Sequence, residues 1–258
     1  MSLYNYPEYY DVAFSYRDVD LECDFIEKKA SLFGLCENSA MLDIACGTGS
    51  HLEQLLRRGY EVDGFDISPS MVDFAKKKVD NACFDSHIWV DNMVAFENNR
   101  KYGVAINLLT GFNYLLKNED ALAHLGRVAD ALESGGIYIV ELNHPRDFIT
   151  NRPSTANTWV ESRGQIEVEV DWDHGRTDVD VLTHQTESSP HIVVKDGGRK
   201  LTVDMQDRYR IYLYQEMILM IQCNGCFELV DARGSFKLDN PLDNSRDSWR
   251  MILVLRRK

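Results

Sequence analysis

The stretch from residue 40 to residue 66 constrains the fold of this chain more than any other. An apolar run of strand type leads into a glycine turn, a helical segment follows, and a second apolar run ends in a carboxylate. In chain order these parts are 40–45, Gly47 with Gly49, about 50–58, 60–65 and Asp66. This order predicts the first half of a doubly wound α/β domain built to hold a nucleoside.

The spacing within the same stretch disfavours one class of nucleoside, the dinucleotides. Glycines without a Cβ let the backbone approach a ligand closely, and Asp66 can accept hydrogen bonds from both hydroxyls of a ribose. A dinucleotide site needs a third glycine, but that position holds Leu52. Asp43, which precedes the turn, is a poor neighbour for a phosphate and a good one for an ammonium group. These features suggest a ligand with a ribose, a cationic amino-acid part and no phosphate, and S-adenosylmethionine fits that description.

These residues resemble a known family. Leu42-Asp-Ile-Ala-Cys-Gly-Thr-Gly49 is similar to the first motif of class I S-adenosylmethionine-dependent methyltransferases, and Asp66 matches the acid of their second strand. The resemblance continues through 90–93, 102–108 and 132–141 and resumes near Tyr209. Members of this family often carry an acid at the start of the fourth strand, where this chain has Gly103.

Together, the spacing and the resemblance predict the cofactor site. We expect the contacts to come from the glycine turn, from the acids at the strand ends, from the segments beside the adenine, and from an amino-terminal tyrosine that closes over the ligand. The predicted residues are Tyr10, Asp43, Ala45, Gly47, Gly49, Asp66, Ile67, Asp91, Asn92, Met93 and Leu108.

Two residues are candidates for the chemistry. His144 follows the fifth predicted strand and is the leading candidate for a general base. The alternative is a structural role, in which hydrogen bonds within the turn between this strand and the lid satisfy the histidine. Tyr16 belongs to the aromatic amino-terminal segment, which is predicted to close over the cofactor. The alternative is that these aromatic residues only pack a cap helix. A sulfonium methyl group is already activated, so alignment of the acceptor and exclusion of water suffice, and we predict no metal site.

Composition narrows the class of partner. The formal net charge of −13 repels phosphate backbones, so we expect no nucleic-acid substrate. No apolar run approaches the roughly 20 residues that a membrane span needs, and the amino terminus does not resemble a secretory signal. The six cysteines are scattered, and the pair Cys223 and Cys226 lacks the second pair that would complete a zinc site. These features predict a reducing, cytoplasmic setting.

The pattern along the chain predicts a Rossmann-like α/β fold: a seven-stranded doubly wound sheet with an amino-terminal helical cap and an antiparallel β insertion after the fifth strand. The predicted units are the cap (1–39), the cofactor-binding domain (40–145 and 209–258) and an inserted β lid (146–208). Within the lid, period-two alternation predicts strands near 166–172, 179–185, 191–194 and 201–205. The helix at 119–132 is expected to end at Gly135-Gly136, ahead of a strand at 137–142.

The amino-terminal tyrosines and the β insertion resemble glycine and sugar-amine N-methyltransferases. The resemblance therefore implies methyl transfer from S-adenosylmethionine to a small molecule by direct displacement, with an amine as the first choice of acceptor and a hydroxyl as the second. Two alternatives remain open, an aminopropyl transferase on the same fold and a non-catalytic module that binds the nucleoside. A nucleic-acid or protein methyltransferase is disfavoured by the charge and by Asn107-Leu-Leu-Thr110, which lacks the Asn/Asp-Pro-Pro-aromatic motif. An exposed face of the insertion could also pair two chains as a homodimer.

Overall fold

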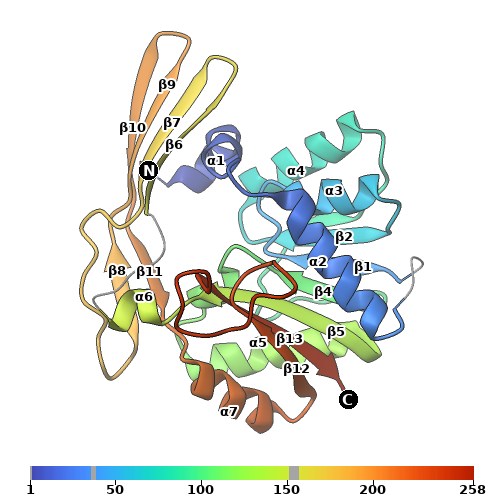
Figure 1. Ribbon diagram of the computed structural model, residues 1–258. Helices are drawn as coiled ribbons and strands as arrows, with labels where there is room; N and C mark the ends of the chain where they lie inside the picture. Colours follow the sequence, from blue (N-terminus) through green and yellow to red (C-terminus); the bar gives the residue numbers. More distant parts are fainter. Residues whose placement is uncertain (1, 36–38, 151–156) are drawn as a thin grey trace.

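A computed structural model describes residues 2–35, 39–150 and 157–258, and its core is a seven-stranded sheet (Figure 1). The strand order is β12-β13-β5-β4-β1-β2-β3, in which β1 to β5 run parallel and β13 is antiparallel to both of its neighbours. The strands are β1 (Met41–Ile44), β2 (Val62–Asp66), β3 (Ile88–Val90), β4 (Tyr102–Asn107), β5 (Leu132–Asn143), β12 (Phe227–Arg233) and β13 (Arg250–Arg257). The predicted fold class is confirmed.

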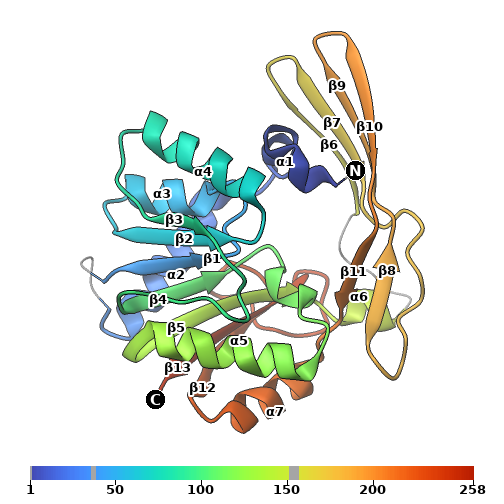
Figure 2. The same ribbon diagram turned by 180° about the vertical axis from the view of Figure 1, so that it is seen from behind.

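Helices cover both faces of this sheet, as Figures 1 and 2 show from opposite sides. One core layer joins the sheet to α5 and α7, and the other joins it to α2, α3 and α4. The helices are α2 (Val19–Leu32), α3 (Ser50–Arg57), α4 (Pro69–Asn81), α5 (Asn118–Ala131) and α7 (Tyr214–Asn224). None of the helices in the described ranges is both long and apolar enough to cross a membrane.

The start of β5 differs from the prediction. The helix α5 already ends at Ala131, and the strand begins at Leu132, five residues earlier than expected. A Cβ on Gly136 would lie 2.9 Å from the carbonyl oxygen of Gly103, so this glycine allows β5 to approach β4 closely. Gly103 has no room for a side chain either, because a Cβ added at this position would lie 2.7 Å from the Cβ of Ser39. A larger residue at position 103 would therefore clash with Ser39.

The amino-terminal segment divides between two neighbours instead of forming one cap. The helix α2 packs on α3, whereas η1 (Leu3–Asn5) and α1 (Pro7–Ala13) share a hydrophobic core with the insertion. That core combines Leu3, Val12 and Ala13 with the inward residues of the inserted strands, such as Val168 and Val194. Residues 1 and 36–38 of the predicted cap lie outside the described part of the chain.

The insertion stands beyond the carboxyl ends of the parallel strands (Figure 1). It has a four-stranded sheet in the order β10-β9-β7-β6, a two-stranded sheet of β11 and β8, and a short helix. These elements are α6 (Arg146–Ile149), β6 (Thr158–Arg163), β7 (Ile166–Asp171), β8 (Gln185–Ser188), β9 (His191–Asp196), β10 (Arg199–Asp204) and β11 (Asp207–Arg210). The predicted boundary between residues 208 and 209 falls inside β11, which pairs with β8.

One predicted strand of the insertion is wrong. Residues 179–184 form an exposed turn, in which Val181 and Leu182 are 82% and 90% exposed. A side-chain oxygen of Asp180 accepts hydrogen bonds from the backbone N–H groups of Leu182 and Thr183, and this local bonding competes with strand pairing. The strand begins only at Gln185.

Candidate active site

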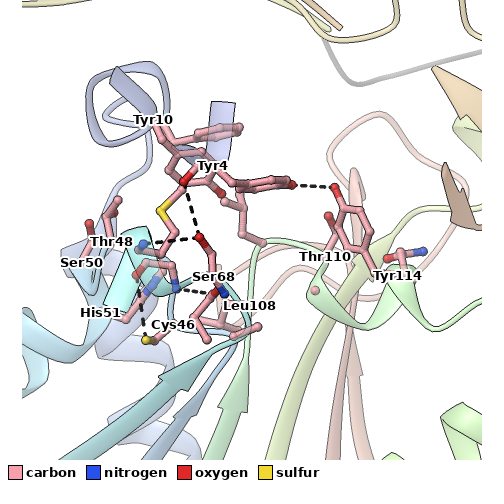
Figure 3. A pocket seen from close by; sticks show the side chains of 18 of the residues that line it. Tyr4, Tyr10, Cys46, Thr48, Ser50, His51, Ser68, Leu108, Thr110 and Tyr114 are labelled. Carbon is pink, nitrogen blue, oxygen red and sulfur yellow. Dashed lines mark hydrogen bonds between the residues drawn. The ribbon is translucent and has the colours of Figure 1, made fainter. Parts of the chain in front are cut away.

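A cavity of about 740 Å³ opens where the carboxyl ends of the parallel strands face the insertion. It lies beside β1, at the point where the strand order reverses, which is where doubly wound folds bind ligands. Figure 3 shows residues of its wall from the amino-terminal segment, the glycine turn and the loop after β4. All the predicted cofactor residues except Gly49 line this cavity, and so does Tyr16.

Asp66 ends β2 and is tied to the glycine turn. One carboxylate oxygen accepts the N–H of Gly47 at 2.9 Å, and the other accepts the N–H of Ser68 at 2.8 Å. Burial raises the pKa of Asp66, and these backbone bonds oppose that rise. Each oxygen retains a lone pair, so the carboxylate can still accept from a pair of ligand hydroxyls.

Asp43, in β1, has a buried oxygen that the protein does not satisfy. Its side chain is 3% exposed, and Oδ2 has no hydrogen-bond partner among the described residues. Burial raises the pKa of Asp43 to about 7, although His51 opposes the rise. An unpaired buried acceptor costs free energy, so this oxygen indicates a missing donor. The ammonium group of an amino-acid ligand is such a donor.

The glycine turn provides an open backbone surface beneath an aromatic ring. Ala45, Gly47 and Gly49 all have positive φ angles, of 57°, 55° and 75°. A Cβ on Gly47 would lie 4.0 Å from the ring of Tyr10, which therefore sits directly above the turn. Gly49 has a different task, because its Cβ would lie 3.0 Å from that of Ala75 and would separate α3 from α4. The residues of this half of the cavity fit the predicted nucleoside with an amino-acid tail.

The predicted adenine segment follows β3. Asp91 uses both carboxylate oxygens locally, one for the indole N–H of Trp89 at 3.0 Å and one for the N–H of Asn92 at 2.8 Å. Its own N–H donates to the carbonyl of Asp66 at 3.1 Å, which joins the two strand ends. Ile67 remains 69% exposed and offers an uncovered apolar surface to a flat ligand ring.

The far end of the cavity is aromatic. Phe14 and Tyr16 follow α1, and Trp159 and Trp172 come from the first hairpin of the insertion. Centroids of contacting rings in this cluster are 5.5 to 6.4 Å apart. The indole of Trp159 donates to the carbonyl of Ala13 at 2.6 Å, which fixes its orientation. Rings arranged in this way attract cations and apolar ligand faces.

A buried ion network supports the floor between the two ends. Glu141, in β5, is fully buried and binds Arg17 at 2.9 Å and Arg250 at 2.9 Å. The same carboxylate accepts the N–H of Leu109 at 2.7 Å. Leu109 and Thr110 have positive φ angles of 52° and 61°, so Glu141 holds a strained turn at the cavity wall. Arg17 continues the network to Glu22, which contacts His51.

The prediction of His144 as a general base is not supported by the structure. His144 is buried outside the cavity lining. Its Nε2 donates to the carbonyl of Asp243 at 2.9 Å, and its Nδ1 accepts the N–H of Arg146 at 3.2 Å. With both ring nitrogens in backbone hydrogen bonds and its pKa lowered by burial, this histidine instead fixes the turn into α6.

Sequence reasoning missed several residues of the cavity. Periodicity cannot identify them, because they come from loops, from single positions on α3, β6 and β13, and from distant parts of the chain. They are Tyr4, Phe14, Arg17, His51, Tyr114, Trp159, Trp172 and Arg250. The density of aromatic residues between positions 4 and 16 was the one available signal.

Comparison with known proteins agrees with this geometry. Residues 41–136 match the sequence profile of a family described as a methyltransferase domain. The matched stretch runs from β1 to the start of β5, so this part of the sheet is similar to a methyltransferase domain. The glycine turn and Asp66 lie within the matched residues, whereas Tyr4, Trp159 and Arg250 of the cavity wall lie outside them.

Two curated relatives and one solved structure illustrate the similarity. The chain is 31% identical over 105 residues to dTDP-3-amino-3,4,6-trideoxy-alpha-D-glucopyranose N,N-dimethyltransferase of Streptomyces venezuelae, covering 41% of this chain and 43% of the relative. It is 26% identical over 103 residues to dTDP-3-amino-3,6-dideoxy-alpha-D-glucopyranose N,N-dimethyltransferase of Streptomyces fradiae, covering 40% and 39%. The matched segments thus span less than half the length of these relatives.

The structural likeness extends over nearly the whole chain. A crystal structure of an S-adenosylmethionine-dependent methyltransferase from Clostridium acetobutylicum superimposes with a TM-score of 0.80 and 18% identity, covering 96% of this chain and 95% of the other. This likeness shows that the seven-stranded sheet and the insertion together have the same fold as that structure.

Proposed function

We propose that the protein transfers a methyl group from S-adenosylmethionine to an amine of a small molecule. The observation that carries this proposal is the pair of acids on the glycine turn: Asp66, with lone pairs free for a ribose, and Asp43, with a buried oxygen that lacks a donor. Together they suit a nucleoside whose other end carries an ammonium group. S-adenosylmethionine supplies an activated methyl group on a sulfonium.

The chain's own residues have separate tasks in this proposal. Asp66 holds the ribose, Asp43 holds the ammonium group, and Tyr10 covers the ligand above Gly47. Ile67 and the 91–93 segment adjoin the adenine, and the backbone near Ala45 and Leu108 completes the cradle. Tyr16 and the other rings of the aromatic cluster exclude water from the acceptor and orient it, which is the main requirement for displacement at an activated methyl group.

An amine acceptor is favoured over a hydroxyl for two reasons. The two relatives named above are N,N-dimethyltransferases of amino sugars, and their names describe the addition of methyl groups to nitrogen. The aromatic cluster also suits the cationic product that methylation of an aliphatic amine leaves. We therefore propose an amino sugar, or a small amine of similar size, as the acceptor.

The setting and assembly of the protein are also proposed. The five described cysteines are free thiols, and the net charge is −13, which supports a cytoplasmic enzyme that does not act on nucleic acid. The four-stranded sheet projects from the core, and β6 and β10 are its outer strands within the described part of the chain, which supports a homodimer formed there (Figure 2). Light scattering should then give twice the chain mass of 29.6 kDa, and a mass of one chain would refute the dimer.

Thermal unfolding with added nucleosides tests the cofactor. We expect S-adenosylmethionine and S-adenosylhomocysteine, at about 100 times their dissociation constants, to stabilise the fold by about 2.7 kcal/mol, and NAD not to. The midpoint should rise by roughly 5–10 °C in a chain of this size. Asp66→Ala should abolish the rise, because the ribose loses its acceptor.

The matched control is Asp73→Ala, which removes an exposed acid from α4 outside the cavity lining. This variant should keep the full response to both sulfur nucleosides. If neither nucleoside stabilises the parent protein, the proposed cofactor is wrong. If both bind but no methyl group reaches any amine or hydroxyl in a labelled-methyl assay, the non-catalytic alternative replaces the enzyme.

A further inference from the structure

Tyr4, Tyr114 and Asp207 form a chain of hydrogen bonds. None of the three has a role in the proposed binding of the cofactor. The hydroxyl oxygens of Tyr4 and Tyr114 are 2.9 Å apart, and the Tyr114 hydroxyl donates to Oδ2 of Asp207 at 2.7 Å. The three residues come from η1, from η2 (Gly111–Tyr114) after β4, and from β11 of the insertion. The chain therefore joins three segments that are far apart in the sequence.

The direction of this chain follows from its last member. A carboxylate can only accept hydrogen bonds, so the single hydroxyl proton of Tyr114 is committed to Asp207. Tyr114 must then accept at its own oxygen, which commits the hydroxyl proton of Tyr4 to Tyr114. The oxygen of Tyr4 keeps a lone pair but has no proton to offer. The chain therefore ends in a group that accepts from a ligand.

This accepting end lies in the cavity. Tyr4 and Tyr114 both line the cavity wall, and Figure 3 shows their hydroxyls meeting across it. The carbonyl oxygen of Tyr4 accepts the hydroxyl of Ser68 beside the Asp66 turn, at 3.5 Å, and its ring lies 5.7 Å from that of Tyr10. Tyr4 thus reaches from the cofactor end of the cavity towards the insertion, where an acceptor would enter.

We infer that Tyr4, Tyr114 and Asp207 remove the proton from the acceptor amine before methylation. This inference rests on the proposed function, since an aliphatic ammonium ion has no lone pair with which to attack. The ammonium N–H gives its proton to the Tyr4 oxygen, the Tyr4 proton passes to Tyr114, and the Tyr114 proton passes to Asp207. The products are a neutral amine, two unchanged tyrosines and a neutral carboxyl group.

The environment of Asp207 suits this task. Its side chain is 8% exposed, and burial raises its pKa, so it accepts a proton more readily than a solvated aspartate. Burial also raises the pKa values of Tyr4 and Tyr114, so both remain protonated and conduct the proton without becoming anions. In this scheme Tyr4 touches the amine, and the other two residues position it and receive its proton.

Binding of two nucleosides tests the inference without any acceptor. Sinefungin carries an amine in place of the transferred methyl group, whereas S-adenosylhomocysteine carries nothing there. We expect calorimetry to show that Tyr4→Phe and Asp207→Asn each reduce the preference for sinefungin over S-adenosylhomocysteine by roughly tenfold or more, as for a hydrogen bond to a charged group. A merely structural role would weaken both ligands together and leave this ratio unchanged.

Tyr9→Phe is the matched control. Tyr9 lies in the same amino-terminal segment and also donates to a carboxylate of the insertion, Asp196 at 3.2 Å, but it does not line the cavity. Its loss should leave the ratio unaltered. If Asp207→Asn does not fold, Tyr114→Phe takes its place, because it breaks the same chain one link earlier.

Three results would overturn the inference in distinguishable ways. An unchanged ratio in both variants would show that the amine does not meet this chain. A ratio that falls in Tyr4→Phe but not in Asp207→Asn or Tyr114→Phe would make Tyr4 a simple contact without a relay. Failure of the parent protein to bind either nucleoside would refute the proposed cofactor and the inference with it.

Discussion

Replacing Glu141 with glutamine should destabilise the protein by about 3–5 kcal/mol, because it leaves Arg17 and Arg250 buried without a full counter-charge. The side chain of Glu141 is fully buried, so solvent does not screen the loss. The strained turn at Leu109 also loses its charged acceptor. Urea denaturation followed by circular dichroism measures the change, with the m-value expected to stay constant.

The pH dependence gives a second measure of the same group. Burial alone raises the pKa of Glu141, but Arg17 and Arg250 outweigh it and hold the pKa well below its usual range. The stabilisation is therefore complete above the unfolded pKa and is lost as the pH falls towards the folded one. Between pH 5 and pH 2 the parent protein should lose this contribution, whereas Glu141→Gln should not.

An exposed ion pair provides the control for this prediction. Glu228 and Arg256 are 3.7 Å apart and about half exposed, so Glu228→Gln should change the free energy of unfolding by less than about 0.5 kcal/mol. A loss below about 1 kcal/mol for Glu141→Gln would mean that desolvation cancels the attraction within the buried network.

Asp43 should make cofactor binding depend on pH. Its pKa of about 7 leaves much of the free protein protonated at neutral pH, whereas pairing with the ligand ammonium needs the ionised form. The dissociation constant for S-adenosylmethionine should therefore rise roughly tenfold for each pH unit below 7. 5′-Methylthioadenosine, which lacks the amino-acid part, should show no such dependence in the same calorimetric titration.

The same residue should oppose stability in the free protein. The pKa of Asp43 is about 7 in the folded protein, against an ordinary value of 3.8. Its contribution to the free energy of unfolding is therefore fully present below pH 3.8 and is lost as the pH rises through 7. The difference amounts to about 4 kcal/mol at pH 8, as an upper bound. Asp43→Asn cannot ionise, so it should unfold at a higher temperature than the parent at pH 8 while losing affinity for S-adenosylmethionine. A lower melting temperature would contradict the unpaired state of Asp43.

Much of the cofactor half could be predicted because its signals are local. The glycine turn and its two acids lie between Asp43 and Asp66, and the topology of a doubly wound sheet brings such strand ends to one edge. The prediction was wrong where local pattern competes with local hydrogen bonding, as at Asp180, and where a close backbone contact shifts a boundary, as at Gly136.

The aromatic end and the charged floor of the cavity could not be predicted, because their contacts join residues that are distant in the sequence. Glu141 meets Arg17 and Arg250 across 124 and 109 positions, and Tyr114 meets Tyr4 and Asp207 across 110 and 93. His144 illustrates the converse case, since its place after a strand suggested catalysis and its partner Asp243, 99 positions away, occupies the ring nitrogen.

By itself, the sequence determined the α/β architecture, the glycine turn and the acids beside it, because backbone sterics and strand-end chemistry act over a few residues. Only the tertiary structure decided which aromatic and charged side chains face the cavity. Their placement depends on the hydrophobic core that α1 shares with the insertion, and contacts between segments so far apart in the sequence produce no periodic pattern along the chain.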